Sequence, residues 1–176
     1  MKNKKACCFI TGAFTPFFKN DCKDAQKSRL EEKIRTEIKK LIEKENVNVF
    51  YTGMEAGADL FAADYILSYK DSCDVSLHCV IPFEEQSAGY DEKTRDLYFS
   101  VAQRSDSEIM FRRKREFSCR KNRDIYMIEK SDVVILFWDM KSPYTFSLLP
   151  YASNKKKIIV VDPLFSQHNS TFRRIE

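Results

Sequence analysis

The chain has 176 residues, of which 43% are hydrophobic and 32% charged, and its formal net charge is +4. This length predicts one domain with a substantial core, and the composition is that of an ordinary globular protein. The small excess of basic residues does not by itself indicate nucleic-acid binding. No stretch approaches the ~20 apolar residues of a membrane span, and the apolar run near the N-terminus is too short for a signal peptide. We therefore expect a cytoplasmic protein that does not bind membranes.

The six cysteines show no metal-ligand spacing, because none of them forms a C-x-x-C pair. In a reducing compartment we also expect no disulfide. The sequence thus predicts no metal and no cofactor.

Strands and helices are predicted to alternate from the N-terminus onward. The predicted strands cover residues 6–11, 47–52, 74–83, 107–112, 132–139 and 157–162. The predicted helices cover 24–46, 57–70, 91–104, 118–131 and 145–153, and Pro150 is expected to bend or end the last of these. Nearly continuous apolar strands are typical of a parallel sheet that is covered on both faces. We therefore predict an α/β fold, a single Rossmann-like three-layer domain with a mostly parallel sheet over residues 1–163, and a C-terminal tail over 164–176.

In such a sheet, ligands bind beyond the carboxyl ends of the strands. Two of the four glycines, Gly53 and Gly57, lie just after the second predicted strand and before a helix. They indicate either a tight turn that packs helix on strand, or a backbone that must approach an anion at a helix N-terminus.

The other strand-end residues also allow two interpretations. Asp59 is either a site residue or a first-turn carboxylate that favours the helix dipole. Ser142 and Thr145 either contact a ligand or cap a helix. Trp138 either stacks on a base or belongs partly to the core.

The segment Phe111–Phe117, "FRRKREF", is a basic cluster bracketed by aromatic residues. Such a segment either holds phosphates and stacks bases or is a solvated loop. The chain contains no Ser/His/Asp order, H-E-x-x-H motif or P-loop, so no known catalytic constellation follows from motifs.

An ordered set of short motifs resembles the SLOG superfamily of Rossmann-like proteins, named for DprA and the LOG enzymes, and most closely its short YpsA-like branch. The matching positions are Thr11-Gly12, Gly53, Gly57, Asp59, Ala62-Ala63, Ile81-Pro82-Phe83 with Gln86, Arg123, Tyr126-Met127 and Ser131-Asp132. The resemblance implies that a nucleotide or nucleotide-derived small molecule binds at the carboxyl edge of the sheet. The ligand-binding residues expected from strand ends and motifs together are Thr11, Gly12, Gly53, Gly57, Ala58, Asp59, Pro82, Phe83, Gln86, Arg123, Trp138, Asp139, Ser142 and Thr145.

The chain also departs from the family pattern. "TGAFTP" replaces T-G-H-R-P, Asp124 replaces an Asn, and Pro143-Tyr144 replaces two glycines. The LOG signature P-G-G-x-G-T-x-x-E is absent, which argues against a LOG-like phosphoribohydrolase. Pro143 has no N–H to offer a phosphate, and the Tyr144 ring would take up space there.

The sequence therefore favours binding, or sensing, of a nucleotide-like small molecule without turnover. One alternative is a nucleotide N-glycosidase, which would need a carboxylate such as Asp59 or Asp139 near the sugar. A second is single-stranded nucleic-acid binding through residues 111–117, as in DprA-like proteins. A third is a scaffold that acts through protein partners, and the chain could also form a homo-oligomer.

Overall fold

Strands and helices alternate along the chain in the computed structural model, which describes residues 4–11, 24–138, 142–153 and 157–162. The strands are β1 (Lys5–Thr11), β2 (Val47–Thr52), β3 (Ser76–Ile81), β4 (Ser107–Met110), β5 (Val133–Phe137) and β6 (Lys157–Val161). The helices are α1 (Asp24–Glu45), α2 (Ala58–Leu67), the 3₁₀ helix η2 (Gln86–Gly89), α3 (Glu92–Arg104), α4 (Cys119–Lys130), α5 (Pro143–Phe146) and α6 (Leu149–Ser153).

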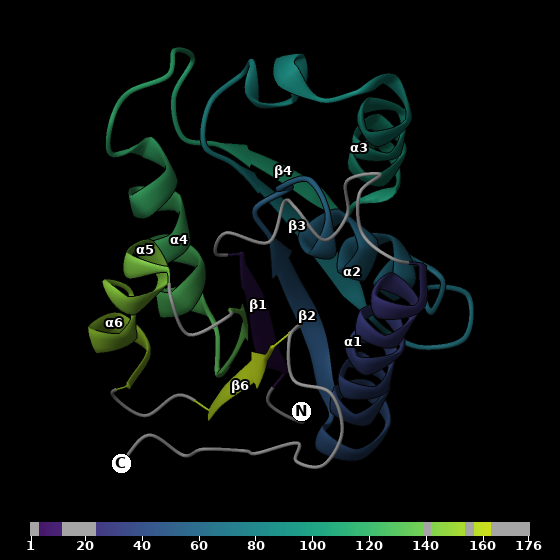
Figure 1. The fold of residues 1–176 in the computed structure, drawn as a ribbon. Coiled ribbons are helices and arrows are strands. Elements are labelled where there is room, and N and C mark those ends of the chain that lie inside the picture. The colour runs from purple at the N-terminus through teal and green to yellow at the C-terminus, as the bar shows by residue number, and fades with distance from the viewer. Residues whose placement is uncertain (1–3, 12–23, 139–141, 154–156, 163–176) are drawn as a thin grey trace.

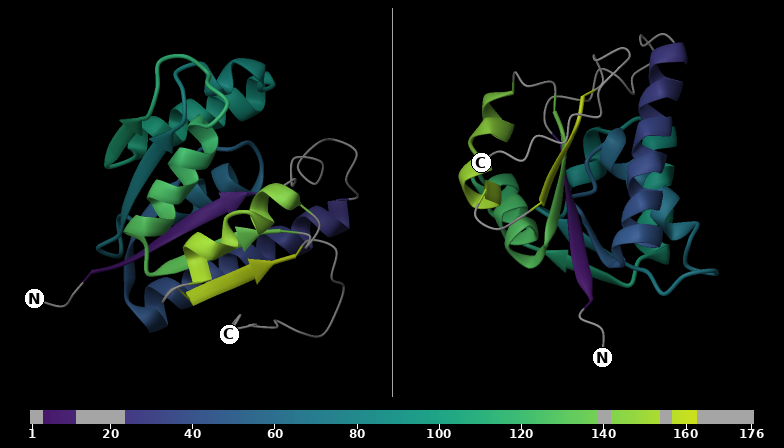
Figure 2. Two further views of the ribbon diagram at one scale, coloured as in Figure 1. Left: turned by 90° about the vertical axis from the view of Figure 1, so that its left-hand side faces the viewer. Right: turned by 90° about the horizontal axis from the view of Figure 1, so that it is seen from below.

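The six strands form one parallel sheet in the order β4-β3-β2-β1-β5-β6. Helices α1, α2 and α3 cover one face, and α4, α5 and α6 cover the other (Figures 1 and 2). This arrangement confirms the predicted Rossmann-like three-layer α/β fold. The strand order reverses between β1 and β5, where Thr11 pairs in register with Phe137. The carboxyl ends of these two strands mark the switch point at which such sheets bind ligands.

The last predicted helix is divided into two short helices, and Pro150 does not end either of them. Pro150 is the second residue of α6, and the break lies before it, at Ser147 and Leu148. The predicted helix is thus interrupted as expected, but the break precedes Pro150, because proline is tolerated in the first turn of α6, where a residue needs no intrahelical N–H bond.

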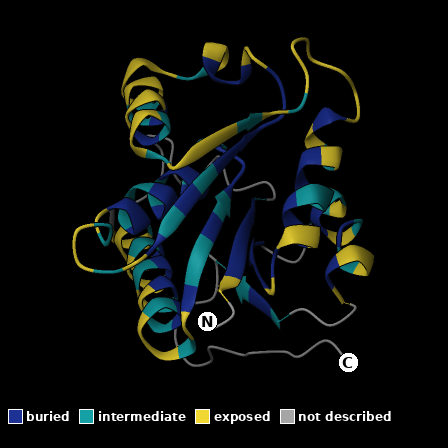
Figure 3. Cartoon of the chain, turned by 180° about the vertical axis from the view of Figure 1, so that it is seen from behind, coloured by how far each residue is buried: buried dark blue, intermediate teal, exposed yellow. Residues whose placement is uncertain are grey.

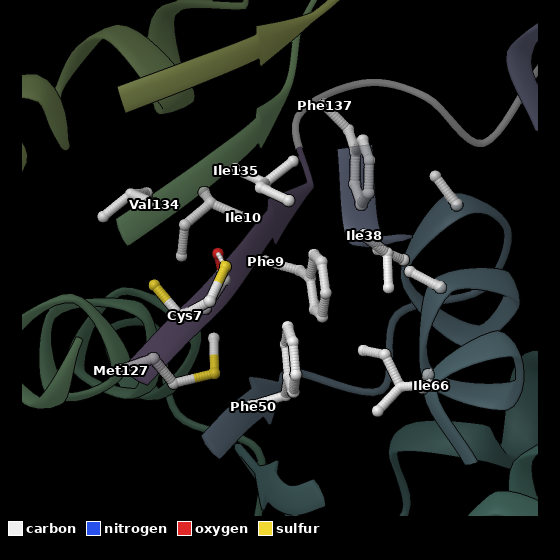
Figure 4. Packing of buried hydrophobic residues seen from close by; sticks show 14 of the residues in the cluster. Cys7, Phe9, Ile10, Ile38, Phe50, Ile66, Met127, Val134, Ile135 and Phe137 are labelled. Atoms are coloured by element: carbon white, nitrogen blue, oxygen red, sulfur yellow. Dashed lines mark hydrogen bonds between the residues drawn. The ribbon is translucent and has the colours of Figure 1, made fainter. Parts of the chain in front are cut away.

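The core lies between the sheet and its two helical layers, as the buried strands in Figure 3 show. The Phe9 ring is stacked between those of Phe50 and Phe137, with ring centroids 6.2 and 5.8 Å away (Figure 4). Three adjacent strands therefore contribute one continuous aromatic stack to the face that α1 and α2 cover. On α1, Leu30, Ile34, Ile38 and Leu41 are buried at helical spacing.

None of the helices in the described part of the chain is long and apolar enough to cross a bilayer. Five cysteines lie within it and none of these is in a disulfide, while Cys22 falls outside it. The predicted tail and the domain boundary at residue 163 also fall outside the described residues.

We predict that Phe9→Ala lowers the free energy of unfolding by roughly 3–5 kcal/mol, because it removes the central ring of the stack and leaves a cavity. Urea denaturation of the variant and the wild type measures this difference. Phe99→Ala is the matched control, because the Phe99 side chain is largely exposed on α3 and its loss should change stability by about 0.5 kcal/mol or less. Equal losses in the two variants would contradict the central role of the stack.

Candidate functional site

Buried polar side chains gather at the carboxyl edge of the sheet, in an otherwise apolar interior. They are Thr52 and Asp59 at the end of β2 and the start of α2, Gln86 after β3, Arg123 and Asp124 on α4, and Thr145 on α5. Burying such groups is costly unless they are hydrogen-bonded, so their partners show what holds this edge together. Two of the expected site residues, Gly12 and Asp139, lie outside the described residues.

The turn between β2 and α2 is held by its own side chains. Asp59 accepts hydrogen bonds from the Thr52 hydroxyl at 2.9 Å and from the Glu55 N–H at 3.0 Å. The Thr52 hydroxyl also accepts from the Met54 N–H at 3.1 Å. Both Asp59 oxygens are therefore engaged inside the turn. Its carboxylate takes up a backbone N–H that an incoming anion would otherwise use.

Tyr90 ties the same turn to the loop before α3. Its hydroxyl donates to the Met54 carbonyl at 3.1 Å and accepts from the Ala56 N–H at 3.2 Å. Met54 is fully buried and has a φ of 58°, which is rare for a residue with a side chain. The bonds from both sides hold this unfavourable backbone in place.

Each glycine of this turn has a structural reason to be glycine. A Cβ atom on Gly53 would lie 2.8 Å from the Cζ of Arg123, closer than two such atoms can approach. Gly57 has a φ of 99°, a conformation that L side chains rarely adopt. These observations agree with the first interpretation, a turn that requires glycine for its geometry and packing. Gly53 allows the close approach of a guanidinium from the protein itself, and Gly57 allows the backbone to enter α2.

Arg123 is the centre of the buried polar network. Its Nη1 donates to the Gly53 carbonyl at 2.9 Å and to Glu55 Oε1 at 2.8 Å, and its Nε donates to Asp124 Oδ1 at 2.7 Å. Burial by itself lowers the pKa of the guanidinium, but the Asp124 and Glu55 carboxylates outweigh burial and hold that pKa above its ordinary value. Arg123 therefore links the end of β2, the turn before α2 and its own helix α4.

Tyr144 connects this network to α5 on the other side of the site. Its hydroxyl donates to Asp124 Oδ2 at 2.5 Å. Burial raises the pKa of Tyr144, and the adjacent Asp124 carboxylate raises it further, so the hydroxyl stays protonated and remains a donor. The two departures from the family pattern, Asp124 and Tyr144, are thus partners in one contact.

The switch point carries polar atoms without partners. The hydroxyls of Thr11 and Thr145 and the indole N–H of Trp138 are buried and have no hydrogen-bond partner within the described part of the chain. Trp138 is almost fully buried after β5, and its ring centroid lies 6.4 Å from that of Phe146, which is largely exposed on α5. Ser142 caps α5, since its hydroxyl accepts from the Thr145 N–H at 3.4 Å.

Of the residues after β3, Gln86 contacts the turn after β2, whereas Phe83 lies beside two arginines. Gln86 Nε2 donates to the Gly53 carbonyl at 2.8 Å, while its Oε1 is buried without a partner among the described residues. Pro82 is buried beside Phe83, and the Phe83 ring lies under two guanidiniums, those of Arg115 and Arg120, each 5.9 Å from its centroid. The motif pair Ser131-Asp132 lies at the opposite edge of the sheet, where Asp132 accepts from the Ala6 N–H, and so belongs to the fold.

Asp59 is a buried carboxyl group at this edge whose pKa is strongly raised. Burial raises the pKa of Asp59 to about 7, against the opposing effects of the Glu55 N–H, the Arg123 charge and the Thr52 hydroxyl. A pKa near neutrality is typical of acid–base catalysts, but both oxygens of Asp59 already have internal partners. Within the described residues, no cluster of three or more His, Cys, Asp or Glu side chains could hold a metal ion.

Several residues of the network were not among the expected site residues. They are Thr52, Glu55, Tyr90, Asp124, Tyr144 and Phe146. Thr52 could have been found from its position between the strand and Gly53. Nothing in the local sequence joins Tyr90 to Ala56, which precedes it by 34 positions.

We predict that Gly53→Ala destabilises the protein by roughly 1–3 kcal/mol, because the new methyl group must displace the Arg123 guanidinium. Gly89→Ala is the matched control, since a Cβ there would meet no atom within 4 Å. Thermal or urea unfolding of both variants measures the effect. In an Arg123→Ala background the cost of Gly53→Ala should largely disappear. An unchanged cost in that background would rule out the proposed clash.

We predict that Asp59 makes the protein less stable as the pH rises from 4 to 7. Below pH 4 the carboxyl group is protonated in the folded and the unfolded chain, whereas above pH 7 its buried charge opposes folding in full. With a folded pKa of about 7 against an ordinary value of 3.8, the loss amounts to roughly 4 kcal/mol. Asp59→Asn should remove this loss, so urea unfolding curves of the two proteins at pH 4, 5, 6 and 7 should diverge in free energy. A constant difference across that range would show that Asp59 does not titrate there.

Comparison with known proteins agrees with this fold and this motif order. The model of the YpsA family, described as the YspA SLOG family, matches residues 16–158. Similar proteins include a UPF0398 protein of Bacillus thuringiensis (strain Al Hakam) and one of Bacillus cereus (strain Q1). Each is 27% identical over 154 residues, which cover 84% of this chain and 82% of the relative. Their names state no ligand, and the superfamily suggests a nucleotide-related function without specifying one. Because the family match spans most of the sequence, the resemblance is confirmed and the chain belongs to the YspA SLOG family.

Proposed function

We propose that the protein binds a nucleotide-derived small molecule at the switch point between β1 and β5, without turning it over. The observation that carries the proposal is a set of buried polar atoms that have no partner among the described residues, the hydroxyls of Thr11 and Thr145 and the indole N–H of Trp138. An unpaired buried polar group costs about 1–3 kcal/mol, so these three groups are expected to have a ligand as partner.

The charges around the site favour an uncharged part of the ligand next to α5. Three carboxyl groups lie near this edge, those of Glu55, Asp59 and Asp124. One guanidinium, that of Arg123, lies among them and donates to Glu55, Asp124 and the Gly53 carbonyl. A phosphate placed beside Tyr144 would face the Asp124 carboxylate behind its hydroxyl. A base or sugar offers donors and acceptors without that repulsion, and the exposed Phe146 ring provides a surface for stacking.

Binding without turnover is supported by the internal hydrogen bonds of the carboxyl groups at this edge. A glycosidase needs one carboxyl group free to donate a proton and another free to act on the sugar or on water. Among the described residues of this edge, Asp59 and Asp124 each have both oxygens in internal hydrogen bonds. They hold the turn and the helices in place, which is a positioning role.

We predict that adenosine binds at least as tightly as AMP. Trp138, the only tryptophan, has its N–H at the proposed site, so intrinsic fluorescence reports binding. Thr145→Val removes the unpaired hydroxyl at nearly constant volume and should weaken adenosine about tenfold, the equivalent of roughly 1.4 kcal/mol.

Thr36→Val is the matched control, because it makes the same chemical change at an exposed position on α1. It should leave adenosine affinity unchanged. Chromatography of the nucleoside after incubation should recover adenosine intact, whereas release of adenine would identify a glycosidase. The proposal is wrong if Thr145→Val and Thr36→Val bind adenosine equally well, or if neither adenosine nor AMP changes the Trp138 fluorescence.

A further inference from the structure

A hollow lies away from the switch point, between the end of β3 and the start of α4. Its volume is about 390 Å³, and it is lined by Phe83, Arg115, Glu116, Phe117, Cys119 and Arg120. This volume falls at the lower end of the range for small-molecule sites, roughly 300–1,000 Å³. The segment that forms it, between β4 and α4, is mostly exposed (Figure 3).

Two guanidiniums lie beside this hollow. The Cζ atoms of Arg115 and Arg120 each lie 5.9 Å from the centre of the buried Phe83 ring, within the range of a cation–π contact. Arg120 lies 3.5 Å from Glu55 Oε1, a carboxylate that Arg123 already pairs at 2.8 Å. Arg115 makes no ion pair with any described residue, and so its charge is not offset.

The remaining lining groups leave the hollow positively charged. Its one carboxylate, Glu116, is paired with Arg112 at 3.5 Å, outside the hollow. Residues 112–121 contain six basic side chains and one acidic side chain. The Cys119 thiol donates to the Glu116 carbonyl at 2.9 Å and adds no charge of its own.

Phe117 gives the hollow an apolar wall. Its side chain is fully exposed although it lines the hollow, whereas the Phe83 side chain is almost fully buried. An exposed phenylalanine next to two guanidiniums offers a surface on which an aromatic ring can stack while the anionic group of the same molecule contacts the guanidiniums.

We propose that this hollow is an anion-binding site that takes a phosphate group carried on a small aromatic molecule. Arg115 and Arg120 bind the phosphate, and Phe117 contacts the aromatic body. The site is separate from the one at the switch point, and it does not depend on the ligand proposed there. A long polyanion such as single-stranded nucleic acid would instead contact the whole basic segment, including Arg113 and Lys114.

Phenyl phosphate, inorganic phosphate and phenol are the probes, and isothermal titration calorimetry measures their affinities. We expect phenyl phosphate to bind more tightly than inorganic phosphate, and phenol not to bind at the same concentrations. Arg115→Ala with Arg120→Ala should weaken phenyl phosphate at least about tenfold, because charge-assisted bonds to the phosphate are lost. Phe117→Ala should remove the advantage of phenyl phosphate over inorganic phosphate.

The matched control is Arg113→Ala with Lys114→Ala, which removes two charges from the same segment at positions that do not line the hollow. It should change phenyl phosphate affinity by less than about twofold by charge screening alone. Arg115→Ala alone is a second test, since it leaves Glu55 and its partners untouched and should not alter the response of Trp138 to adenosine. The proposal would be overturned if the two double variants lost equal affinity for phenyl phosphate. It would also be overturned if a single-stranded oligonucleotide bound more tightly than phenyl phosphate and both double variants weakened that binding equally. An absence of phenyl phosphate binding to the folded wild type would overturn it as well.

Discussion

The buried guanidinium of Arg123 is the interaction on which the arrangement of this edge depends. A cation in the interior is tolerated only when carboxylates and carbonyls surround it, and here Gly53, Glu55 and Asp124 supply them. Each partner fixes a different element, namely the end of β2, the turn before α2, and α4 itself. Through Asp124 and Tyr144 the same network reaches α5. A displacement of Arg123 would therefore disturb the hydrogen bonds to the turn before α2 and, through Asp124, the contact with α5.

The parallel sheet makes such a network possible by bringing distant segments to one edge. Strands β1, β2, β3 and β5 end side by side, and the apolar stack of Phe50, Phe9 and Phe137 fixes three of them relative to one another. Polar groups beyond those ends are shielded from water by the helices on both faces, so each unpaired group is costly and each pair is strong. The apolar core thus keeps the strand ends together, and with them the polar side chains that lie beyond those ends.

The two polar regions of this edge have opposite electrostatic character. Around the 53–57 turn, carboxyl groups outnumber the buried guanidinium, and burial raises the pKa of Asp59 to about 7. Beside Phe83, in contrast, two arginines face a hollow whose one carboxylate is paired elsewhere. Glu55 contacts arginines from both regions and marks the border between them. This difference is why we assign an uncharged group to the position next to α5, where the Asp124 carboxylate lies behind Tyr144, and a phosphate to the hollow beside Phe83.

The sequence by itself determined the layers of this fold, because continuous apolar strands alternating with amphipathic helices have few other ways to bury their surface. It also indicated that Gly53, Gly57, Asp59, Gln86, Arg123 and Thr145 belong to one edge, since each follows a strand or matches a motif. Only the tertiary structure decided what they do there. The clash that requires glycine at position 53 comes from a side chain 70 positions away, and Tyr144 meets Asp124 across two helices. Local propensity and spacing carry no information about such contacts, because they depend on distances that are set only when the sheet and both helical layers are assembled.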